Sequence, residues 1–507
     1  MRKFWEDHPL KSILLIGLIV RIIAVFLSQG YLMHDDHFLV IEPASSWVVG
    51  EDHDRWLPWN MKEGDSIHAF NFAYVGSQFL LLKGMYEIGI QNPKVQMIII
   101  RFLHALYSLF IILYGFKITR KLSNLKTART VGIILALLAF MPNFSVRQLV
   151  EMACIPPIMW GFWKLIQHRE SKAILSYVLA GIGLGIATGI RYQCGVFGIG
   201  LGLAMLVEKN LKGATIVGIV SLMVFSIMQL PDIFVWGKPF TQLQAYINYN
   251  IGHRNDYTSG PWYKFILTTL GFLIPPISVF IAIGFFKEWK KQLVIFLPVL
   301  IFLLFHSAFP NKQERFILPA FPLLISLGLI GWNNLVAKKG WEKTRKGLLK
   351  FSWRFFWVTN SLALVLFTMA YTKKSRVEVM SHFYNTGELK NFVTVAANKT
   401  VMPPQYYSGI WCRYIDFQSH QKMEWINEVA NRKPEGQKPN FVIFFGSKDV
   451  PAKVKEVKEY WPNIQFVKKY NPGMLDKILH FLNDKNTLEE AHIYSLPISD
   501  IKREQPD

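Results

Sequence analysis

The chain has 507 residues, of which 51% are hydrophobic and 15% aromatic, and its formal net charge is +21. Long apolar runs fill most of the sequence before residue 372, which excludes a soluble globular protein and indicates a polytopic membrane protein. The basic excess does not indicate nucleic-acid binding, because many Lys and Arg residues separate the apolar runs instead of gathering in one soluble segment.

Apolar runs that could cross a bilayer predict about eleven transmembrane helices, each compared with the roughly 20 residues that a span needs. No small-residue cleavage site follows the first run, so we expect it to remain as a membrane anchor. The runs are residues 13–27, 95–116, 131–140, 149–166, 174–190, 196–207, 214–230, 265–286, 293–309, 316–335 and 355–371.

Residues 70–88 form a further apolar candidate, and its placement decides the topology. If this segment lies along the outer membrane surface as a re-entrant or interfacial helix, every strongly basic short loop falls on the cytoplasmic side, as the positive-inside rule requires. If it crossed the membrane, all those loops would face outward. We therefore predict an interfacial helix in the first outer loop.

The same topology collects the unusual polar residues near the membrane on the extracytoplasmic side, which indicates that the protein functions there. These residues are Asp35, Asp36, Glu42, Arg147, Glu151, Arg191 to Gln193, residues 232–262 and residues 311–315.

The composition changes after residue 371, where the sequence becomes charged and has no run of spanning length. Residues 441–445 read as a buried strand, 450–461 as an amphipathic helix and 464–467 as another strand. We expect a transmembrane catalytic domain over residues 1–371 and a small extracytoplasmic soluble α/β domain over residues 372–507.

Asp35 and Asp36, flanked by His34 and His37, come shortly after the first apolar run and the turn-like residues 28–30. Carboxylates at the edge of hydrocarbon are costly unless water, a cation or a proton partner satisfies them. They could be solvated loop acids, or they could bind a metal together with Asp52-His53-Asp54, although adjacent residues seldom all reach one ion. In the third interpretation one aspartate is a general base that accepts a proton from an attacking hydroxyl.

Residues 311–315, Asn-Lys-Gln-Glu-Arg, place several charged groups at the outer start of a predicted span. Lys312 and Arg315 could be ordinary snorkelling anchors. They lie on the outer side, however, whereas the basic residues that set membrane topology lie in cytoplasmic loops. Lys or Arg on the outer side suits a phosphate ligand. Arg191, at another outer helix end, is a second phosphate candidate or a packing residue.

The segment 232–262, read as an outer loop, is rich in Trp, Tyr and Asn. Aromatic faces and amide donors suit sugar recognition, and interfacial belts use the same residues.

Taken together, these segments resemble the polyprenyl-phosphate-mannose-dependent mannosyltransferases of the GT-C superfamily, which extend N-glycan precursors and GPI anchors. Residues 35–43 are similar to that family's Asp-Glu loop with its trailing Glu, with Asp36 in place of the first Glu. Residues 312–316 resemble its His-Lys-Glu-x-Arg-Phe signature, with Asn311 in place of the His and with Gln313 separating Lys312 from Glu314.

Two further segments carry the resemblance. Residues 232–262 are similar to the family's central luminal loop, and residues 401–408 to a C-terminal stretch that has Pro404 and Gln405 where eukaryotic members often have Cys and His. The resemblance covers residue 13 to about residue 371, and these departures indicate a distant, bacterial branch.

The resemblance implies a GT-C-like polytopic α-helical fold and an inverting transfer of a sugar, mannose in this family, from a polyprenyl- or dolichyl-phosphate donor to a glycan or glycolipid hydroxyl. Asp35, with Asp36 second, would be the catalytic base, and Lys312, Arg315 and Arg191 would bind the donor phosphate. No metal or other cofactor is expected. The candidate substrate-binding residues are Glu42, Glu151, Tyr192, Gln193, Tyr249, Asn250, Trp262 and Glu314.

Two alternatives remain: a flippase or transporter of a lipid-linked sugar, and a GT-C enzyme that uses another sugar to modify lipid A or protein. A transporter should have ionisable residues at mid-span and broken helices in related halves. A bacterial inner membrane with a periplasmic active site is the expected location, and the endoplasmic reticulum with a luminal site is the alternative.

Overall fold

The computed structural model describes residues 2–51, 57, 60, 72–171, 173–254, 256, 259–396, 402–418, 420–447, 449–484, 486 and 488–501. The chain divides into two compact units. The helical unit consists of Met1–Phe26, Glu63–Ser77 and Ile100–Met369, and the sheet unit consists of Leu27–Lys62, Gln78–Ile99 and Ala370–Asp507.

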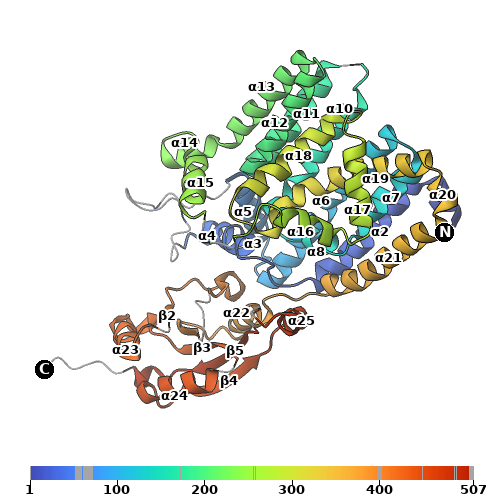
Figure 1. Cartoon of the computed structure of the whole chain (residues 1–507). Helices are drawn as coiled ribbons and strands as arrows, with labels where there is room; N and C mark the ends of the chain where they lie inside the picture. Colours follow the sequence, from blue (N-terminus) through green and yellow to red (C-terminus); the bar gives the residue numbers. More distant parts are fainter. Residues whose placement is uncertain are drawn as a thin grey trace. The chain divides into compact units, whose positions relative to one another are not determined.

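The part of the chain before residue 370 is almost entirely helical (Figure 1). Each of the longer helices overlaps a predicted apolar run or the candidate 70–88, although α7 and α21 begin six and nine residues before the runs 131–140 and 355–371. They are α2 (Pro9–Leu27), α5 (Phe72–Glu87), α6 (Pro93–Leu122), α7 (Leu125–Leu137), α10 (Ile155–Gln167), α11 (Ile174–Ile190), α12 (Gly195–Val207), α13 (Leu211–Met228), α17 (Ile277–Lys287), α18 (Leu293–Ala308), α19 (Phe321–Lys338) and α21 (Lys346–Thr368).

Short helices join the long ones and carry several of the polar residues singled out above. They are α1 (Arg2–Asp7), α3 (Asp35–Phe38), α4 (Ile41–Val49), α8 (Met141–Ser145), α9 (Val150–Ala153), α14 (Leu230–Trp236), α15 (Thr241–Gly252), α16 (Lys264–Phe272), α20 (Trp341–Thr344) and the 3-10 turns η2 (Tyr192–Cys194) and η3 (Glu314–Ala320).

Four segments of the described chain are helical, long and apolar enough to cross a membrane: Pro9–Leu27, Pro93–Leu122, Leu211–Trp236 and Glu314–Lys338. Ile174–Ile190, Tyr192–Val207 and Leu293–Ala308 are shorter apolar helices. These helices make the chain an integral membrane protein. The expected total of about eleven spans stays a prediction.

Two sequence expectations are wrong in detail. The run 265–286 is not one helix, because α16 and α17 are bent by 117° at a break that contains Pro275 and Pro276. Proline lacks the amide hydrogen and collides with the preceding turn, so two in succession end a helix. The segment 232–262 is not an open loop either, because α14 and α15 fill most of it, separated by Gly237 at a φ of 68°.

The expected interfacial helix corresponds to α5, and residues 70 and 71 of that expectation lie outside the described residues. Whether α5 lies along the membrane surface stays a prediction.

Helices α17 and α19 approach each other very closely. A Cβ added at Gly284 would collide with the backbone of Gly328, and one added at Gly331 would collide with the carbonyl oxygen of Gly284. Small residues let backbones touch in this way, and van der Waals packing drives helix association in lipid.

Arg21, within α2, is a buried charge that the sequence interpretation did not single out. Its guanidinium donates to the Ser108 hydroxyl at 2.8 Å and to the carbonyl oxygens of Gly17 and Ala136, each at 3.2 Å. Ala136 belongs to the last turn of α7, where carbonyls lack helical partners and favour a cation. The contacts give Arg21 a structural role.

The sheet unit contains a five-stranded sheet in the order β2-β1-β3-β5-β4. Strand β1 pairs parallel with β2 and β3, whereas β5 pairs antiparallel with β3 and β4. The sheet confirms the prediction of an α/β C-terminal part. The strands are β1 (Phe392–Ala396), β2 (Ile415–Phe417), β3 (Phe441–Gly446), β4 (Gln465–Tyr470) and β5 (Glu490–Ser495), with helices α22 (Lys374–Thr386), α23 (Met423–Arg432), α24 (Val450–Tyr460) and α25 (Met474–Leu482).

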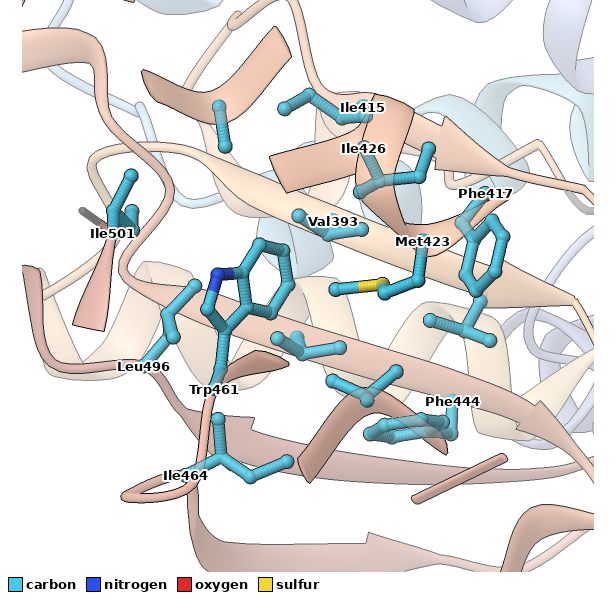
Figure 2. Packing of buried hydrophobic residues seen from close by; sticks show 14 of the residues in the cluster. Val393, Ile415, Phe417, Met423, Ile426, Phe444, Trp461, Ile464, Leu496 and Ile501 are labelled. Atoms are coloured by element: carbon cyan, nitrogen blue, oxygen red, sulfur yellow. The ribbon is translucent and has the colours of Figure 1, made fainter. Parts of the chain in front are cut away.

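The sheet has a hydrophobic core on the side of α23 and α24 (Figure 2). Phe444 of the central strand β3 is buried against it, as expected for a strand covered on both faces. Figure 2 shows the Trp461 indole beside Leu496 and Ile464. The indole nitrogen of Trp461 donates to Asn427 Oδ1 at 3.0 Å, which satisfies the one polar atom of this buried ring.

Candidate active site

The two adjacent aspartates of α3 have different surroundings. Asp36 is buried, and its carboxylate accepts hydrogen bonds from the amides of Leu32 at 2.9 Å and Met33 at 3.0 Å. It therefore closes the turn that leads into α3. Asp35, one residue earlier, is only half-buried. Asp36 has a structural task, and Asp35 is the aspartate with solvent access.

Glu42, on α4, is 2% exposed and is held by two partners within the sheet unit. Its Oε1 lies 2.9 Å from His37 Nε2 and accepts the amide hydrogen of Tyr406 at 3.1 Å. The His37 ring is stacked between Tyr31 and Tyr407, with ring centroids 4.9 and 5.4 Å away. Tyr406 and Tyr407 belong to the 3-10 turn η4 (Gln405–Ser408), so the acidic segment and residues 405–408 form one buried cluster.

Burial controls the protonation of this cluster. Desolvation raises the pKa of Glu42 to about 8, and the hydrogen bond from the Tyr406 amide opposes this rise. Desolvation lowers the pKa of His37 to about 3, and the charge of Asp36 opposes this fall. The His37–Glu42 pair thus holds one proton between about pH 3 and pH 8. His37 and the Tyr406 amide fix the position of the Glu42 carboxylate within the sheet unit.

This shared proton predicts a pH-dependent stability. In the unfolded chain Glu42 and His37 have both lost their protons above about pH 6.5. Between about pH 6.5 and pH 8 only the folded pair holds a proton. The free energy of unfolding should therefore fall by about 2 kcal/mol over this pH range. Between about pH 4.5 and 6.5 both states hold one proton and the contribution is flat. Below pH 4.5 the unfolded pair binds a second proton, whereas the folded pair still holds one because burial keeps His37 neutral. The free energy of unfolding therefore falls as the pH decreases from 4.5 toward 3.

Denaturant unfolding of the detergent-solubilised protein between pH 6 and 8.5 measures this slope. Glu42→Gln keeps an oxygen for the Tyr406 amide but cannot titrate, so it should remove the decline above pH 6.5. An unchanged slope in that variant would show that another group is responsible.

Two buried arginines and one carboxylate form a cationic cluster in the helical unit. Arg191 directly follows α11 and Arg315 lies in η3, and each is 4% exposed. Glu151 Oε1 lies 3.7 Å from Arg191 Nη2 and 3.4 Å from Arg315 Nε. Arg191 Nη1 also donates to the Phe316 carbonyl at 3.3 Å. Arg191 Nη2 is buried without a hydrogen-bond partner in the described chain.

Lys312 is held by the end of α18. Its ammonium donates to the carbonyl oxygens of His306 at 3.0 Å, Ser307 at 2.7 Å and Phe309. Desolvation, and secondly the charge of Lys264, lowers the pKa of Lys312. A cation there satisfies carbonyls that have no helical partner.

Lys264 connects the same turn to Glu314. It donates to the Lys312 carbonyl at 2.9 Å and lies 3.2 Å from the Glu314 carboxylate. The segment 311–315 is therefore a rigid turn whose position Lys264 and Lys312 fix from both sides.

Other candidates extend the cationic cluster along η2. Gln193 accepts from Arg191 Nε at 3.3 Å and donates to the Tyr246 hydroxyl, and Tyr192 donates to Gln229 at 3.1 Å. Tyr246 is a member of this network that the sequence did not identify individually.

The remaining sugar-binding candidates lie on or after α15. The side chain of Asn250 donates to the Tyr246 carbonyl at 2.8 Å. Tyr249 is half exposed and Trp262 is two-thirds exposed, so part of each ring is accessible to a ligand, while the centroid of the Tyr249 ring also lies 4.5 Å from that of the His253 ring.

His306, on α18, has a buried Nε2 with no hydrogen-bond partner in the described chain, while its Nδ1 lies 2.9 Å from the Phe302 carbonyl. An orphaned buried nitrogen calls for a ligand or water. For metal binding, no group of three His, Cys, Asp or Glu side chains comes together in the described chain. Asp52-His53-Asp54 lie outside the described residues.

Comparison with solved structures identifies the fold. The chain is similar to ArnT from Cupriavidus metallidurans bound to undecaprenyl phosphate, with a TM-score of 0.59, 12% identity and coverage of 97% of this chain and 99% of that one. It is also similar to the oligosaccharyltransferase from Archaeoglobus fulgidus in complex with zinc and sulfate, with a TM-score of 0.54, 11% identity and coverage of 90% and 72%. For AglB of that organism, in complex with an inhibitory peptide and a dolichol-phosphate, the TM-score is 0.50 at 10% identity, with coverage of 92% and 74%.

None of the curated protein sequences matches the chain. The Alg9-like mannosyltransferase family, in contrast, matches residues 12–409, which include α3, the cationic cluster and η4. The resemblance to GT-C mannosyltransferases is thereby confirmed, and its extent is larger than the motifs indicated. The chain belongs to the Alg9-like mannosyltransferase family and has the GT-C fold of these glycosyltransferases.

Proposed function

We propose that the protein is an inverting mannosyltransferase that takes its sugar from a polyprenyl-phosphate donor and transfers it to a hydroxyl of a glycan or glycolipid on the extracytoplasmic face. The observation that carries the proposal is the pair of buried guanidinium groups of Arg191 and Arg315 beside Glu151, with Arg191 Nη2 buried without a hydrogen-bond partner in the described chain. Guanidinium groups bind a lipid phosphate through charge-assisted hydrogen bonds. ArnT with undecaprenyl phosphate and AglB with dolichol-phosphate are proteins of this fold that bind such lipids.

In the proposed reaction Asp35 accepts the proton of the acceptor hydroxyl as its oxygen attacks C1 of the sugar. The new C1–O bond forms as the bond from C1 to the phosphate oxygen breaks, and the polyprenyl phosphate leaves with that electron pair. Attack opposite to the leaving group inverts C1. The half-buried position of Asp35 supports this role, since a base must reach a bound hydroxyl.

The leaving phosphate gains negative charge as the bond breaks, so it needs fixed positive charge more than a proton donor. Arg191 and Arg315 supply that charge in this proposal. Lys312 contributes a nearby positive charge and holds the turn that carries Arg315, because its ammonium is bonded to the carbonyls at the end of α18. Glu42 positions α3 and η4 through His37 and Tyr406. The proposed sugar and acceptor contacts are Tyr192, Gln193, Tyr249, Asn250, Trp262 and Glu314.

For the topology we propose about eleven spans, with α5 at the outer surface, a transmembrane catalytic domain over residues 1–371 and an extracytoplasmic domain over residues 372–507. The positive-inside distribution of Lys and Arg supports this arrangement. A bacterial inner membrane with a periplasmic site is the proposed location, with the endoplasmic reticulum lumen as the alternative.

The second candidate, a flippase for a lipid-linked sugar, is favoured by the charge of Arg21 in α2 and by the bent α16–α17 pair. Both are features of transporters. The four hydrogen bonds of Arg21 to Ser108 and to carbonyl oxygens, however, account for that charge structurally.

The test is a transfer assay with the full chain in proteoliposomes. Radiolabelled polyprenyl-phosphate-mannose is offered with a panel of glycolipid and oligosaccharide acceptors, and polyprenyl-phosphate-glucose is the competing donor. Labelled mannose in a new glycosidic linkage, with release of polyprenyl phosphate, is the expected result. Transfer of glucose alone would reject mannose as the sugar, and movement of intact donor between leaflets without transfer would establish the flippase.

A further inference from the structure

A groove with a volume of about 500 Å³ lies between helices α1, α7 and α21 of the helical unit. It belongs neither to the acidic segment nor to the cationic cluster. We call it the tryptophan groove, because three of its lining residues are tryptophans. It is lined by Trp5, Lys126, Arg129, Ile133, Trp353 and Trp357, among others.

Arg129 is a half-buried charge of this groove. Its Nη2 donates to the carbonyl oxygens of Trp5 at 3.4 Å and Glu6 at 3.2 Å, and its guanidinium lies over the Trp5 ring at 5.8 Å. In the described chain no carboxylate pairs with Arg129, and its Nε is buried without a hydrogen-bond partner. A guanidinium held in place in this way, without a counter-charge, suits an anion.

Lys126 lies one turn before Arg129 on α7 and lines the same groove. Its ammonium is 2.8 Å from Glu342, but the two side chains are 80% and 61% exposed. A pair this exposed contributes little to stability and can exchange for another anion. The groove therefore offers two cations to one ligand.

The outer side of α21 indicates where the ligand comes from. Phe351, Phe355, Val358 and Leu362 of this helix are between 46% and 67% exposed, as expected for a surface that faces lipid. Tryptophans next to basic residues mark the interface between hydrocarbon and headgroups. Further along the same two elements, Asn360 of α21 accepts from the Ala139 amide at 2.9 Å and donates to the Leu137 carbonyl at 2.7 Å, which holds α21 against the end of α7.

We propose that the tryptophan groove binds an anionic membrane phospholipid, with the headgroup phosphate on Arg129 and Lys126 and an acyl chain along Ile133 and Trp357. Basic pockets between transmembrane helices bind anionic headgroups in this manner. This lipid is a bound neighbour, not the sugar donor. The proposal depends on the membrane location of the chain and not on its transfer activity.

Native mass spectrometry of the full chain in detergent tests the proposal, with phosphatidylglycerol and phosphatidylcholine titrated separately. One molecule of phosphatidylglycerol should bind specifically. Arg129→Gln should weaken the affinity for this lipid roughly tenfold, as expected for loss of one charge-assisted contact. Arg354→Gln is the matched control, because it removes an exposed arginine of α21 that does not line the groove.

Lys126→Gln is the second variant, because a side chain that is 80% exposed can change without loss of the fold. It should weaken phosphatidylglycerol binding by a smaller factor than Arg129→Gln. Equal binding by Arg129→Gln and the wild type, or an equal loss in Arg354→Gln, would overturn the proposal. Displacement of the lipid by millimolar inorganic phosphate would also overturn it, because the site would then serve a soluble anion.

Discussion

Replacing Asp35 by asparagine should lower kcat for sugar transfer by about 10²–10⁴, the contribution of a general base, and should leave the KM for the lipid-phosphate donor nearly unchanged. Asparagine has the shape of aspartate but cannot accept the hydroxyl proton at neutral pH. Asp35 is half-buried in α3, so the amide should be accommodated without loss of fold. Initial rates with radiolabelled donor, normalised to folded protein, measure the effect.

Asp36→Asn is the matched control, because it makes the same change one residue away. The Asp36 carboxylate accepts two backbone amides, and an asparagine can accept only one of them without presenting an NH₂ group to the other. We expect a loss of stability of about 1–3 kcal/mol, the cost of one unsatisfied buried donor, with turnover per folded molecule largely kept. Inactive folded Asp36→Asn together with active Asp35→Asn would reverse the two roles.

The limits of some helices follow from local properties of the sequence, which is why these could be predicted. The run 174–190 has the same limits as α11, and 293–309 differs from α18 by one residue, because charged residues and turn formers bound each apolar stretch. The prediction failed where local signals compete. Pro275 and Pro276 interrupt an otherwise uniform apolar run, and the helices α14 and α15 form in a segment whose Tyr, Asn and Trp content also suits a loop.

The site was harder to predict, since its contacts join distant parts of the chain. Asp35, Arg191 and Lys312 stand out in the sequence because charges near apolar runs are costly. The bond between Glu42 and the Tyr406 amide, in contrast, joins residues 364 positions apart, and no local pattern announces it. The contacts that hold Lys312 could not be predicted from side-chain patterns either, because their carbonyl oxygens belong to the backbone.

Replacing Arg191 or Arg315 by glutamine should lower kcat/KM for the lipid-phosphate donor by about 10²–10³, the usual cost of removing one electrostatic contact to developing charge. Both guanidinium groups are buried beside Glu151. Charges interact strongly at a buried site, and water cannot take the place of a guanidinium group that is removed. Arg169→Gln is the control, since Arg169 pairs with Glu208 at 2.7 Å in a partly exposed position of the same unit. Unchanged donor kinetics in both cluster variants would remove them from the phosphate site.

Glu151→Gln removes a negative charge from the same cluster, whereas the arginine variants remove a positive one, and it tests the charge balance more sharply. Without the carboxylate, Arg191 and Arg315 lose the negative charge beside both guanidinium groups, and the free energy of unfolding should fall by about 3–5 kcal/mol. A bound phosphate should restore much of this, because it supplies the lost negative charge and any ligand that binds only the folded state stabilises it. A donor analogue such as polyprenyl phosphate should therefore raise the melting temperature of Glu151→Gln more than that of the wild type. Equal shifts would show that the phosphate binds away from these arginines, since only a ligand close to them can replace the missing carboxylate.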